Sequence, residues 1–455
     1  MLTEKEIQTA RDCIRYAMEA GADGARATLN KSVMDGCAMF NGSLDKVTHS
    51  ADRSIYMYLF ADGRYGTFST NRLEPKELES FIRKALAMVR MLGEDTCRQL
   101  PQPERTAKDA VTGRELGLYD CAYEDMDINR RLENARELAI YGKETCCGDG
   151  WKLISEDCEY SDTMDDSFTV DSQGFEGRHT ETAFTCFSEM TIESDSGEKY
   201  SGHWWESSSR HDRLEISACG RMALERAVRQ MNPKKRKSGR YRMVVESTVA
   251  TRLVSPLFSA LNASAIQQKM SFLADTAGKD VFSEGLTIKD MARTAGKPGS
   301  RLFDTEGVAT RDCDIIRNGK VMQYFVNTYM ANKTGFEPTV EDISRPCLMP
   351  FVKGKDWTSE EKELSLNAIL RLCGNGILVT GFNGGNCNPA TGDFSFGIEG
   401  FAFSRGRIVH PVREMLITGN MVTLWKSLIA AGNDARECTR WQVPSLAFED
   451  VSFSA

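Results

Sequence analysis

Residues 54–70 read SIYMYLFADGRYGTFST, and this pattern decides the fold class. Apolar and polar side chains alternate on both sides of Asp62-Gly63, a dipeptide that favours the two-residue turn of a β-hairpin. The stretch therefore predicts two antiparallel strands. A second dipeptide of the same kind, Asn41-Gly42, comes shortly before it, so more than one hairpin is expected in this part of the chain.

Helices are predicted on both sides of these hairpins, because apolar residues recur there at helical intervals. The same order of elements then returns further along the chain. The predicted helices cover 4–20, 72–92, 126–145 and 212–231, and the later hairpins cover 151–174 and 182–209. A repeated helix–hairpins–helix order implies antiparallel sheets flanked by helices, which is an α+β fold, and predicts a structural duplication in the N-terminal part.

Three domains are predicted from the length and from two boundary signals. A chain of 455 residues is too long for one compact core. Pro101–Arg105, which reads PQPER, and the basic run at 232–238 have the composition of linkers. We therefore expect an N-terminal α+β domain over 1–105, a middle α+β domain over 106–232 and a larger, β-rich C-terminal domain over 233–455.

The composition is that of a soluble globular protein. Hydrophobic residues make up 41% and charged residues 27% of the chain. No apolar run reaches the ~18 residues that cross a bilayer, and the start, MLTEKEIQTARD, lacks the apolar core of a signal peptide. Fourteen cysteines without a C-x-x-C pair favour reduced thiols. A cytoplasmic protein without a membrane partner is therefore expected.

The net charge of −8 counts against a nucleic-acid partner, since a phosphate-backbone binder normally presents a basic face. One basic run, NPKKRKSGRYR at 232–242, is the exception. We interpret it as a solvated linker. Direct binding to nucleic acid is not predicted.

Residues 381–401, GFNGGNCNPATGDFSFGIEGF, contain six glycines, so the backbone is expected to approach another group closely. A phosphate-binding loop needs a lysine after its last glycine, and none follows here. A nucleophile elbow around Ser395 needs a glycine where Asp393 stands, because a side chain would clash in the strained turn. Neither site is therefore predicted.

No histidine pair with the spacing of a metal site is found. The five histidines are His49, His179, His203, His211 and His410, and none belongs to an H-E-x-x-H motif. Cys387 and Cys438 are candidate thiol nucleophiles, but no signal in the sequence supplies an activating histidine. The residues taken alone therefore indicate an α+β protein with no assembled catalytic group.

The stretch from Asn388 to Ala435 resembles the C-terminal signature of the PmbA/TldD family, whose members were once labelled modulators of DNA gyrase. The matching elements are Thr391–Ser395 (TGDFS), Pro411–Glu414 (PVRE), Ile417–Asn420 (ITGN) and Gly432–Asp434 (GND). Three further stretches, 41–71, 239–253 and 303–335, also resemble family segments. The resemblance covers nearly the whole chain.

The resemblance also implies which kind of subunit this is. TldD-like members carry H-E-x-x-x-H on a helix, where two histidines bind the metal and the glutamate activates water. Here Val254 and Ser259 take the histidine positions and Ser255 takes the glutamate position. Neither valine nor serine replaces an imidazole ligand, and serine is no general base at neutral pH. Cys438 falls near a family ligand cysteine but is not expected to bind metal.

The chain therefore resembles the PmbA (TldE) kind, the partner subunit without the metal motif. No cofactor is expected in this subunit, and a divalent metal such as zinc is expected in a TldD-like partner. The first function hypothesis is a non-catalytic subunit of a metalloprotease that processes unfolded peptides, assembled with a TldD-like subunit or as a homodimer. The second is an independent homodimeric hydrolase or peptide-binding protein that uses Ser395, Cys387 or His410. A modulator of DNA gyrase is a third, which the acidic charge disfavours.

Peptide binding is expected at the glycine-rich stretch, because an exposed strand edge binds extended peptides through backbone hydrogen bonds. The alternative is a purely structural turn that caps a strand. The candidate binding residues are Asn383, Gly384, Gly385, Asn388, Thr391, Gly392, Asp393 and Ser395.

Overall fold

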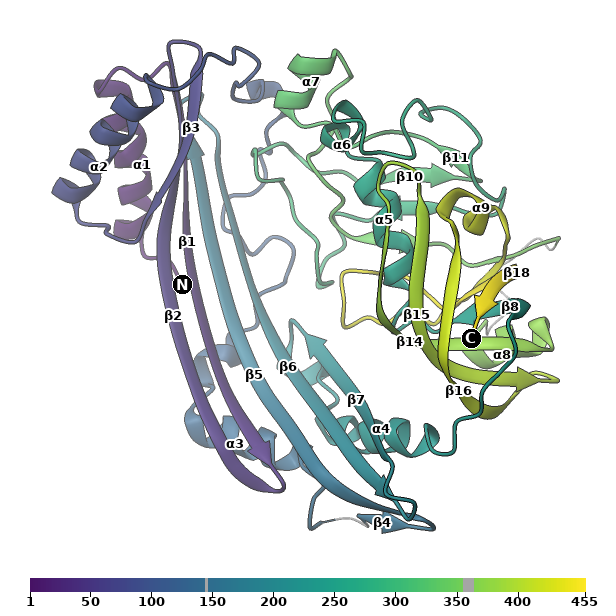
Figure 1. Ribbon diagram of the computed structural model, residues 1–455. Coiled ribbons are helices and arrows are strands. Elements are labelled where there is room, and N and C mark those ends of the chain that lie inside the picture. Colours follow the sequence, from purple (N-terminus) through teal and green to yellow (C-terminus); the bar gives the residue numbers. More distant parts are fainter. Residues whose placement is uncertain (144–145, 355–363) are drawn as a thin grey trace. The chain divides into compact units, whose positions relative to one another are not determined.

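A computed structural model of the chain describes residues 1–143, 146–354 and 364–455. The chain forms two compact units. Unit 1 comprises 1–230, 293–310 and 328–336, and unit 2 comprises 231–292, 311–327 and 337–455. Helices flank the sheets, and among the described strands the pairings are antiparallel apart from one, which confirms the predicted α+β fold (Figure 1). The domain limits at residues 105 and 232 remain predictions.

Unit 1 is built on one long antiparallel sheet with the strand order β3-β2-β1-β5-β6-β7 (Figure 1). Its strands are β1 (Gly24–Phe40), β2 (Ser43–Ala61), β3 (Arg64–Thr70), β5 (Trp151–Asp171), β6 (Glu176–Ser194) and β7 (Lys199–Ser208), and β4 (Cys147–Gly148) pairs with β5. Both predicted turns are present. Asn41-Gly42 and Asp62-Gly63 each have two residues with positive φ, as a type I′ turn requires.

The two predicted sets of elements meet in this sheet, where β1 pairs with β5. The register runs without a break from Arg26 opposite Asp171 to Phe40 opposite Asp157. Each set of strands therefore contributes to a single sheet and does not form a sheet of its own.

Helices cover this sheet at two places. The helices of unit 1 are α1 (Glu4–Glu19), α2 (Pro75–Val89), α3 (Ile128–Leu138), α4 (Ile216–Arg229) and α7 (Thr328–Thr334), with 3-10 turns at Pro103–Arg105, Cys121–Asp125 and His211–Arg213. α1 packs on β1 and β5 and α2 on β2 and β3, whereas α3 packs on β1, β5 and β6 and α4 on β6 and β7. The helix predicted over 126–145 is thus shorter, and its residues 144 and 145 lie outside the described ranges.

A capping box fixes the start of α1. The Glu6 backbone N–H donates to the Thr3 hydroxyl, and the Thr3 backbone N–H donates to the Glu6 carboxylate. Burial alone would raise the pKa of Glu6, but hydrogen bonds from Thr3 and Arg53 outweigh it and lower the pKa to about 2. The charged form of this carboxylate therefore stabilises the fold.

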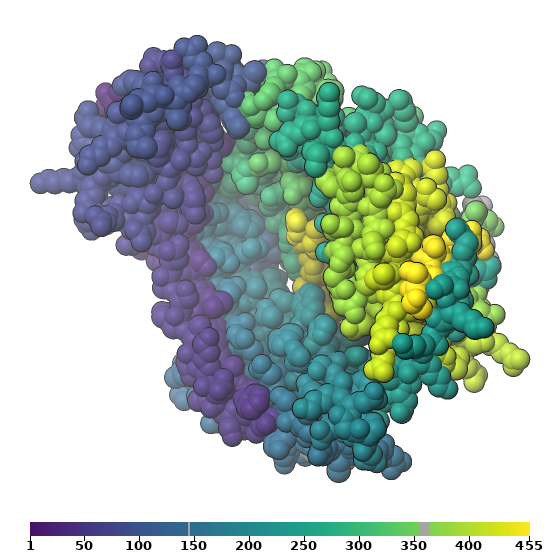
Figure 2. All heavy atoms as spheres, viewed as in Figure 1, coloured from purple at the N-terminus to yellow at the C-terminus, as the bar shows by residue number. Residues whose placement is uncertain are grey.

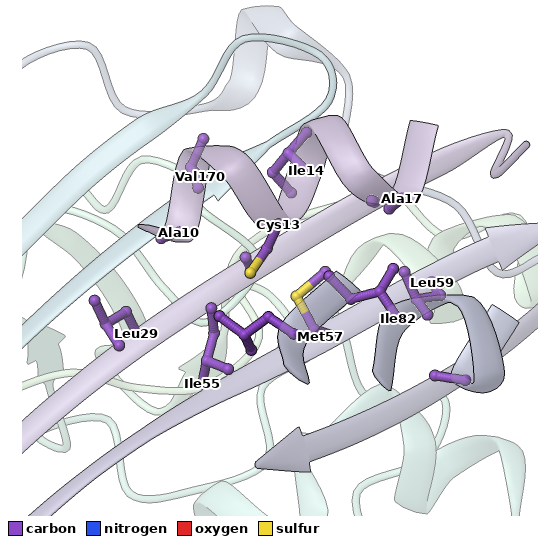
Figure 3. Close-up of a cluster of buried hydrophobic side chains, with 14 of the residues drawn as sticks. Ala10, Cys13, Ile14, Ala17, Leu29, Ile55, Met57, Leu59, Ile82 and Val170 are labelled. Atoms are coloured by element: carbon purple, nitrogen blue, oxygen red, sulfur yellow. The ribbon is translucent and has the colours of Figure 1, made fainter. Parts of the chain in front are cut away.

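The apolar stripe of α1 faces the sheet and forms the core shown in Figure 3. The labelled side chains point toward one another from α1, α2 and the strands below them. They are Ala10, Cys13, Ile14, Ala17, Leu29, Ile55, Met57, Leu59, Ile82 and Val170, all of them buried. Each large apolar side chain that is buried in this way contributes roughly 1.5–3 kcal/mol to stability.

Unit 2 is built on a sheet that closes on itself. Five strands follow one another in the order β8-β14-β15-β16-β18, and β18 returns to pair with β8. They are β8 (Gly239–Val245), β14 (Gly376–Cys387), β15 (Asp393–Ser404), β16 (Arg407–Asn420) and β18 (Leu446–Ser454), and β17 (Leu428–Ala431) and β13 (Phe351–Val352) extend the sheet from β18. Closure removes most strand edges from this barrel.

Smaller elements complete unit 2. A second sheet has the order β11-β10-β9-β12. Its strands are β9 (Ile288–Asp290), β10 (Cys313–Arg317), β11 (Lys320–Val321) and β12 (Pro346–Leu348), and the helices of unit 2 are α5 (Thr251–Ala260), α6 (Ala263–Gln267), α8 (Leu366–Cys373) and α9 (Met421–Lys426). In the described ranges, none of the helices is long and apolar enough to cross a membrane.

Candidate functional site

The glycine-rich stretch forms the β14–β15 hairpin of unit 2. The two strands pair from Gly376 opposite Phe403 to Cys387 opposite Phe394. The register shifts between Phe382 and Gly385, so the strand bulges there.

Two consecutive glycines make this bulge. Gly384 and Gly385 have φ values of +85° and +83°, in the region that other residues rarely adopt. A Cβ atom at Gly385 would lie 1.9 Å from the Ser395 carbonyl oxygen, whereas a Cβ at Gly384 would meet nothing within 4 Å. Gly385 is therefore required by both conformation and packing, and Gly384 by conformation alone.

The outer edge of β14 is open beyond Val379. β8 pairs in parallel with residues 377–379 only, and the last bond on that side runs from the Glu246 N–H to the Val379 carbonyl at 3.0 Å. Within the described residues no strand pairs with this edge from Thr380 to Cys387. The bulge residues are exposed, and the hairpin, in yellow-green, lies at the surface in Figure 2. Such an edge offers backbone donors and acceptors to an extended chain.

Arg252 of α5 lies at the far end of this open edge. Its Nη2 donates to the Gly385 carbonyl at 2.8 Å, and its guanidinium lies 5.0 Å from the centre of the Phe396 ring. Trp425 of α9 holds the same helix by donating from Nε1 to the Leu253 carbonyl at 3.2 Å. α5 is therefore fixed beside the bulge.

The residues that the resemblance assigns to the metal motif lie on this helix, and their side chains do not fit a metal. Val254 has no donor atom and is fully buried in the core. Ser255 is half-buried, and the exposed Ser259 donates its hydroxyl to the Ser255 carbonyl at 3.3 Å. Neutral hydroxyls are poor zinc ligands. Across the part of the chain that the structure describes, no group of three or more His, Cys, Asp or Glu side chains could hold a metal ion.

Other candidate residues form the turn that closes the hairpin. The Asp393 carboxylate accepts from Asn420 Nδ2 at 3.0 Å and from the Thr391 hydroxyl at 2.7 Å, and these bonds lower the pKa of Asp393. Asn388 Oδ1 accepts from the Ala390 N–H at 2.9 Å. The TGDFS and ITGN elements thus bind each other. Asn388, Thr391 and Asp393 hold the turn, while Asn383, Gly384 and Gly385 lie on the open edge.

Gly392 has a φ of +79° and packs against Phe272, so it also belongs to this turn.

The GND element has a structural role, because it connects two segments of unit 2 through hydrogen bonds. The Asp434 carboxylate accepts from the Leu366 N–H at the start of α8, and from the N–H and hydroxyl of Ser445. Trp441, three residues after Cys438, packs on Phe258 of α5 with ring centres 5.7 Å apart.

The structure does not bring the candidate nucleophiles together with a base. Ser395 is exposed opposite Thr418, while His410 lies opposite Ala402. Seven residues of β15 separate the two places, which is about 23 Å along a strand. Burial, followed by the nearby Asp393 charge, raises the pKa of the Cys387 thiol, so this cysteine is not activated.

Arg252 is the site residue that sequence reasoning missed. One signal was available. A basic side chain in the first turn of a helix opposes the helix dipole, which favours acids there. An arginine placed against this preference at the second residue of α5 indicates a specific contact, which the Gly385 carbonyl provides.

Models of one family match most of the chain. The PmbA/TldA metallopeptidase domain 1 matches residues 30–89, its central domain 123–231 and its C-terminal domain 238–455. Metalloprotease PmbA of Escherichia coli O157:H7 is 24% identical over 99% of this chain and 97% of its own length. A Haemophilus influenzae homologue of PmbA is 25% identical over 100% of this chain and 98% of its own.

Solved structures of similar proteins indicate the same family. A Bacteroides thetaiotaomicron protein, named as a proposed modulator of DNA gyrase, is 37% identical, covers 100% of both chains and superposes with a TM-score of 0.92. TldE from Thermococcus kodakarensis is 16% identical, covers 98% of this chain and 100% of its own, and has a TM-score of 0.79, which shows the shared fold. The chain belongs to the PmbA/TldD family, whose members are metallopeptidase-like proteins.

Proposed function

We propose that this chain is the non-catalytic subunit of a cytoplasmic metalloprotease that processes unfolded peptides, and that a TldD-like partner carries the metal. The observation that supports this proposal is the open edge of β14 next to α5. The edge offers hydrogen bonds to a peptide backbone, while the motif positions of the adjacent helix hold a valine and two serines.

Backbone pairing suits a subunit that presents substrates of many sequences. An extended peptide that adds to β14 is held through its N–H and C=O groups, so side chains contribute little to selection. A folded protein pairs in this way only where it exposes a strand edge, because its own strands and helices use most of these groups. The substrates of the complex are therefore unfolded peptides.

The alternative of an independent hydrolase has less support. It needs Ser395, Cys387 or His410 to act together with a base. Ser395 and His410 lie far apart on the barrel, and the Cys387 thiol has a raised pKa. A homodimer that binds peptides without cleaving them remains the second candidate, because the open edge alone suffices for binding.

The experiment is to purify the full chain alone and together with a TldD-like subunit, and to measure bound metal and hydrolysis of an unfolded peptide. We expect the isolated chain to bind peptide without hydrolysing it, and activity to appear only in the complex. This activity should survive Ser395→Ala and Cys387→Ala in this chain. Stoichiometric metal or hydrolysis by the chain alone would overturn the proposal, as would the absence of any complex.

A further inference from the structure

We infer that the open edge of β14 reads the C-terminus of its peptide, with Arg252 holding the terminal carboxylate. This inference rests on the proposed peptide-binding function and adds a direction and a terminal group to it. It is argued from the charge and position of Arg252 at the far end of the edge.

Arg252 is able to take a carboxylate. Its side chain is exposed, one N–H is used by the Gly385 carbonyl, and no carboxylate of the described residues is paired with it. A guanidinium carries five N–H donors in a planar fork that matches a carboxylate with two parallel bonds. The bond to Gly385 and the contact with Phe396 fix the direction of this fork before a peptide arrives.

Glu246 marks the opposite end of the edge. β8 stops at Val245, and Glu246 follows it, with its N–H bound to the Val379 carbonyl and its carboxylate accepting from the Thr248 hydroxyl at 2.6 Å. The open stretch from Thr380 to Gly385 is about 16 Å long at the rise of a strand. A short peptide segment thus fits between Glu246 and Arg252.

The position of Arg252 favours one direction of the peptide. A peptide parallel to β14 continues the line of β8 and brings its carboxylate to Arg252 and its preceding residues past Glu246. An antiparallel peptide on the same edge would direct its carboxylate to the end that lies away from Arg252. A terminal carboxylate is therefore favoured only at the Arg252 end.

The test compares two versions of one short unstructured peptide, with a free C-terminal carboxylate and with a C-terminal amide. Binding to the full chain is measured by fluorescence anisotropy. We expect the acid to bind roughly tenfold more tightly than the amide, the effect of one charge-assisted bidentate contact. Arg252→Gln should remove this difference, because it lowers the affinity for the acid far more than the affinity for the amide.

Arg240→Gln is the matched control. Arg240 is an exposed arginine of β8 that is paired with Asp450. This variant should retain the preference for the acid. If Arg252→Gln fails to fold, rising salt applied to the wild-type chain should reduce the affinity for the acid alone.

The inference is overturned if the wild-type chain binds acid and amide equally, or if the preference survives in Arg252→Gln. A photo-crosslinker at the peptide N-terminus should label residues near Glu246, and labelling near Gly385 would refute the direction. If the proposed peptide-binding function itself is wrong, the result differs from these outcomes, because neither peptide would bind to the chain or to its complex.

Discussion

Replacing Gly385 by alanine tests whether close packing against Ser395 fixes the bulge of β14. The added Cβ would lie 1.9 Å from the Ser395 carbonyl oxygen, far inside any normal contact, and the residue would have to keep a φ of +83°. The oxygen belongs to the backbone of β15, so it moves only if the hairpin deforms. The Arg252 bond to the Gly385 carbonyl should then break.

The expected loss of stability has two parts. Holding alanine at positive φ costs about 1–2 kcal/mol. Forcing the two backbones apart adds about 1–3 kcal/mol, the usual cost of overpacking. Gly384→Ala isolates the first part, because its φ is +85° but its Cβ meets nothing within 4 Å. We expect Gly385→Ala to lose about 3 kcal/mol and Gly384→Ala about 1 kcal/mol.

Urea unfolding of the two variants measures this difference. Since two compact units need not unfold in one step, hydrogen exchange of residues 376–404 should be followed alongside to report on the hairpin itself. Gly385→Ala should also weaken peptide binding, and Gly384→Ala should weaken it less. Equal losses of stability in the two variants would refute the argument that packing against Ser395 fixes the bulge.

Three further predictions concern the rest of the fold. Asp434→Ala should lower the free energy of unfolding by about 2–4 kcal/mol in urea titrations, because Ser445 and the start of α8 lose their acceptor. Glu6→Gln should be less stable than the wild type near neutral pH, and the difference should vanish as pH falls from about 4.5 to about 2, since the pKa of Glu6 is lowered to about 2 and protonation removes the stabilising charge. Arg131→Leu should cost about 3–5 kcal/mol, because it leaves the fully buried Asp162 carboxylate unpaired, and adding Asp162→Leu should recover most of the loss.

The local elements of this fold could be predicted from the sequence, but the closure of the barrel in unit 2 could not. Turn dipeptides such as Asp62-Gly63 carry their own conformational requirement, so the hairpins were predictable from short windows. The return of β18 to β8 joins residues about 200 positions apart. No local pattern encodes such a pairing, since it depends on which edges remain free after all other strands have paired.

In the candidate site, too, local features could be predicted and long-range contacts could not. The glycines at 384 and 385 indicate unusual backbone dihedral angles from their residue type alone. The sequence does not show that Asp393 bonds to Asn420, or that Arg252 reaches Gly385, because both contacts need the closed hairpin and the placement of α5. Residue chemistry did indicate that Val254, Ser255 and Ser259 are unsuited to a metal, since that follows from the atoms they carry.

The pairing of β1 with β5 bears on how the protein folds during synthesis. β1 leaves the ribosome more than a hundred residues before its partner β5. Every residue of β1 from Arg26 to Phe40 pairs with a residue of β5. Until β5 arrives, one side of β1 is an unpaired edge, which is prone to associate with other chains. A fragment that ends near residue 105 should therefore aggregate, and full-length synthesis should benefit from a chaperone that covers this edge. The slow step of folding is expected to be the joining of the two halves at this seam, since a contact between distant segments forms late.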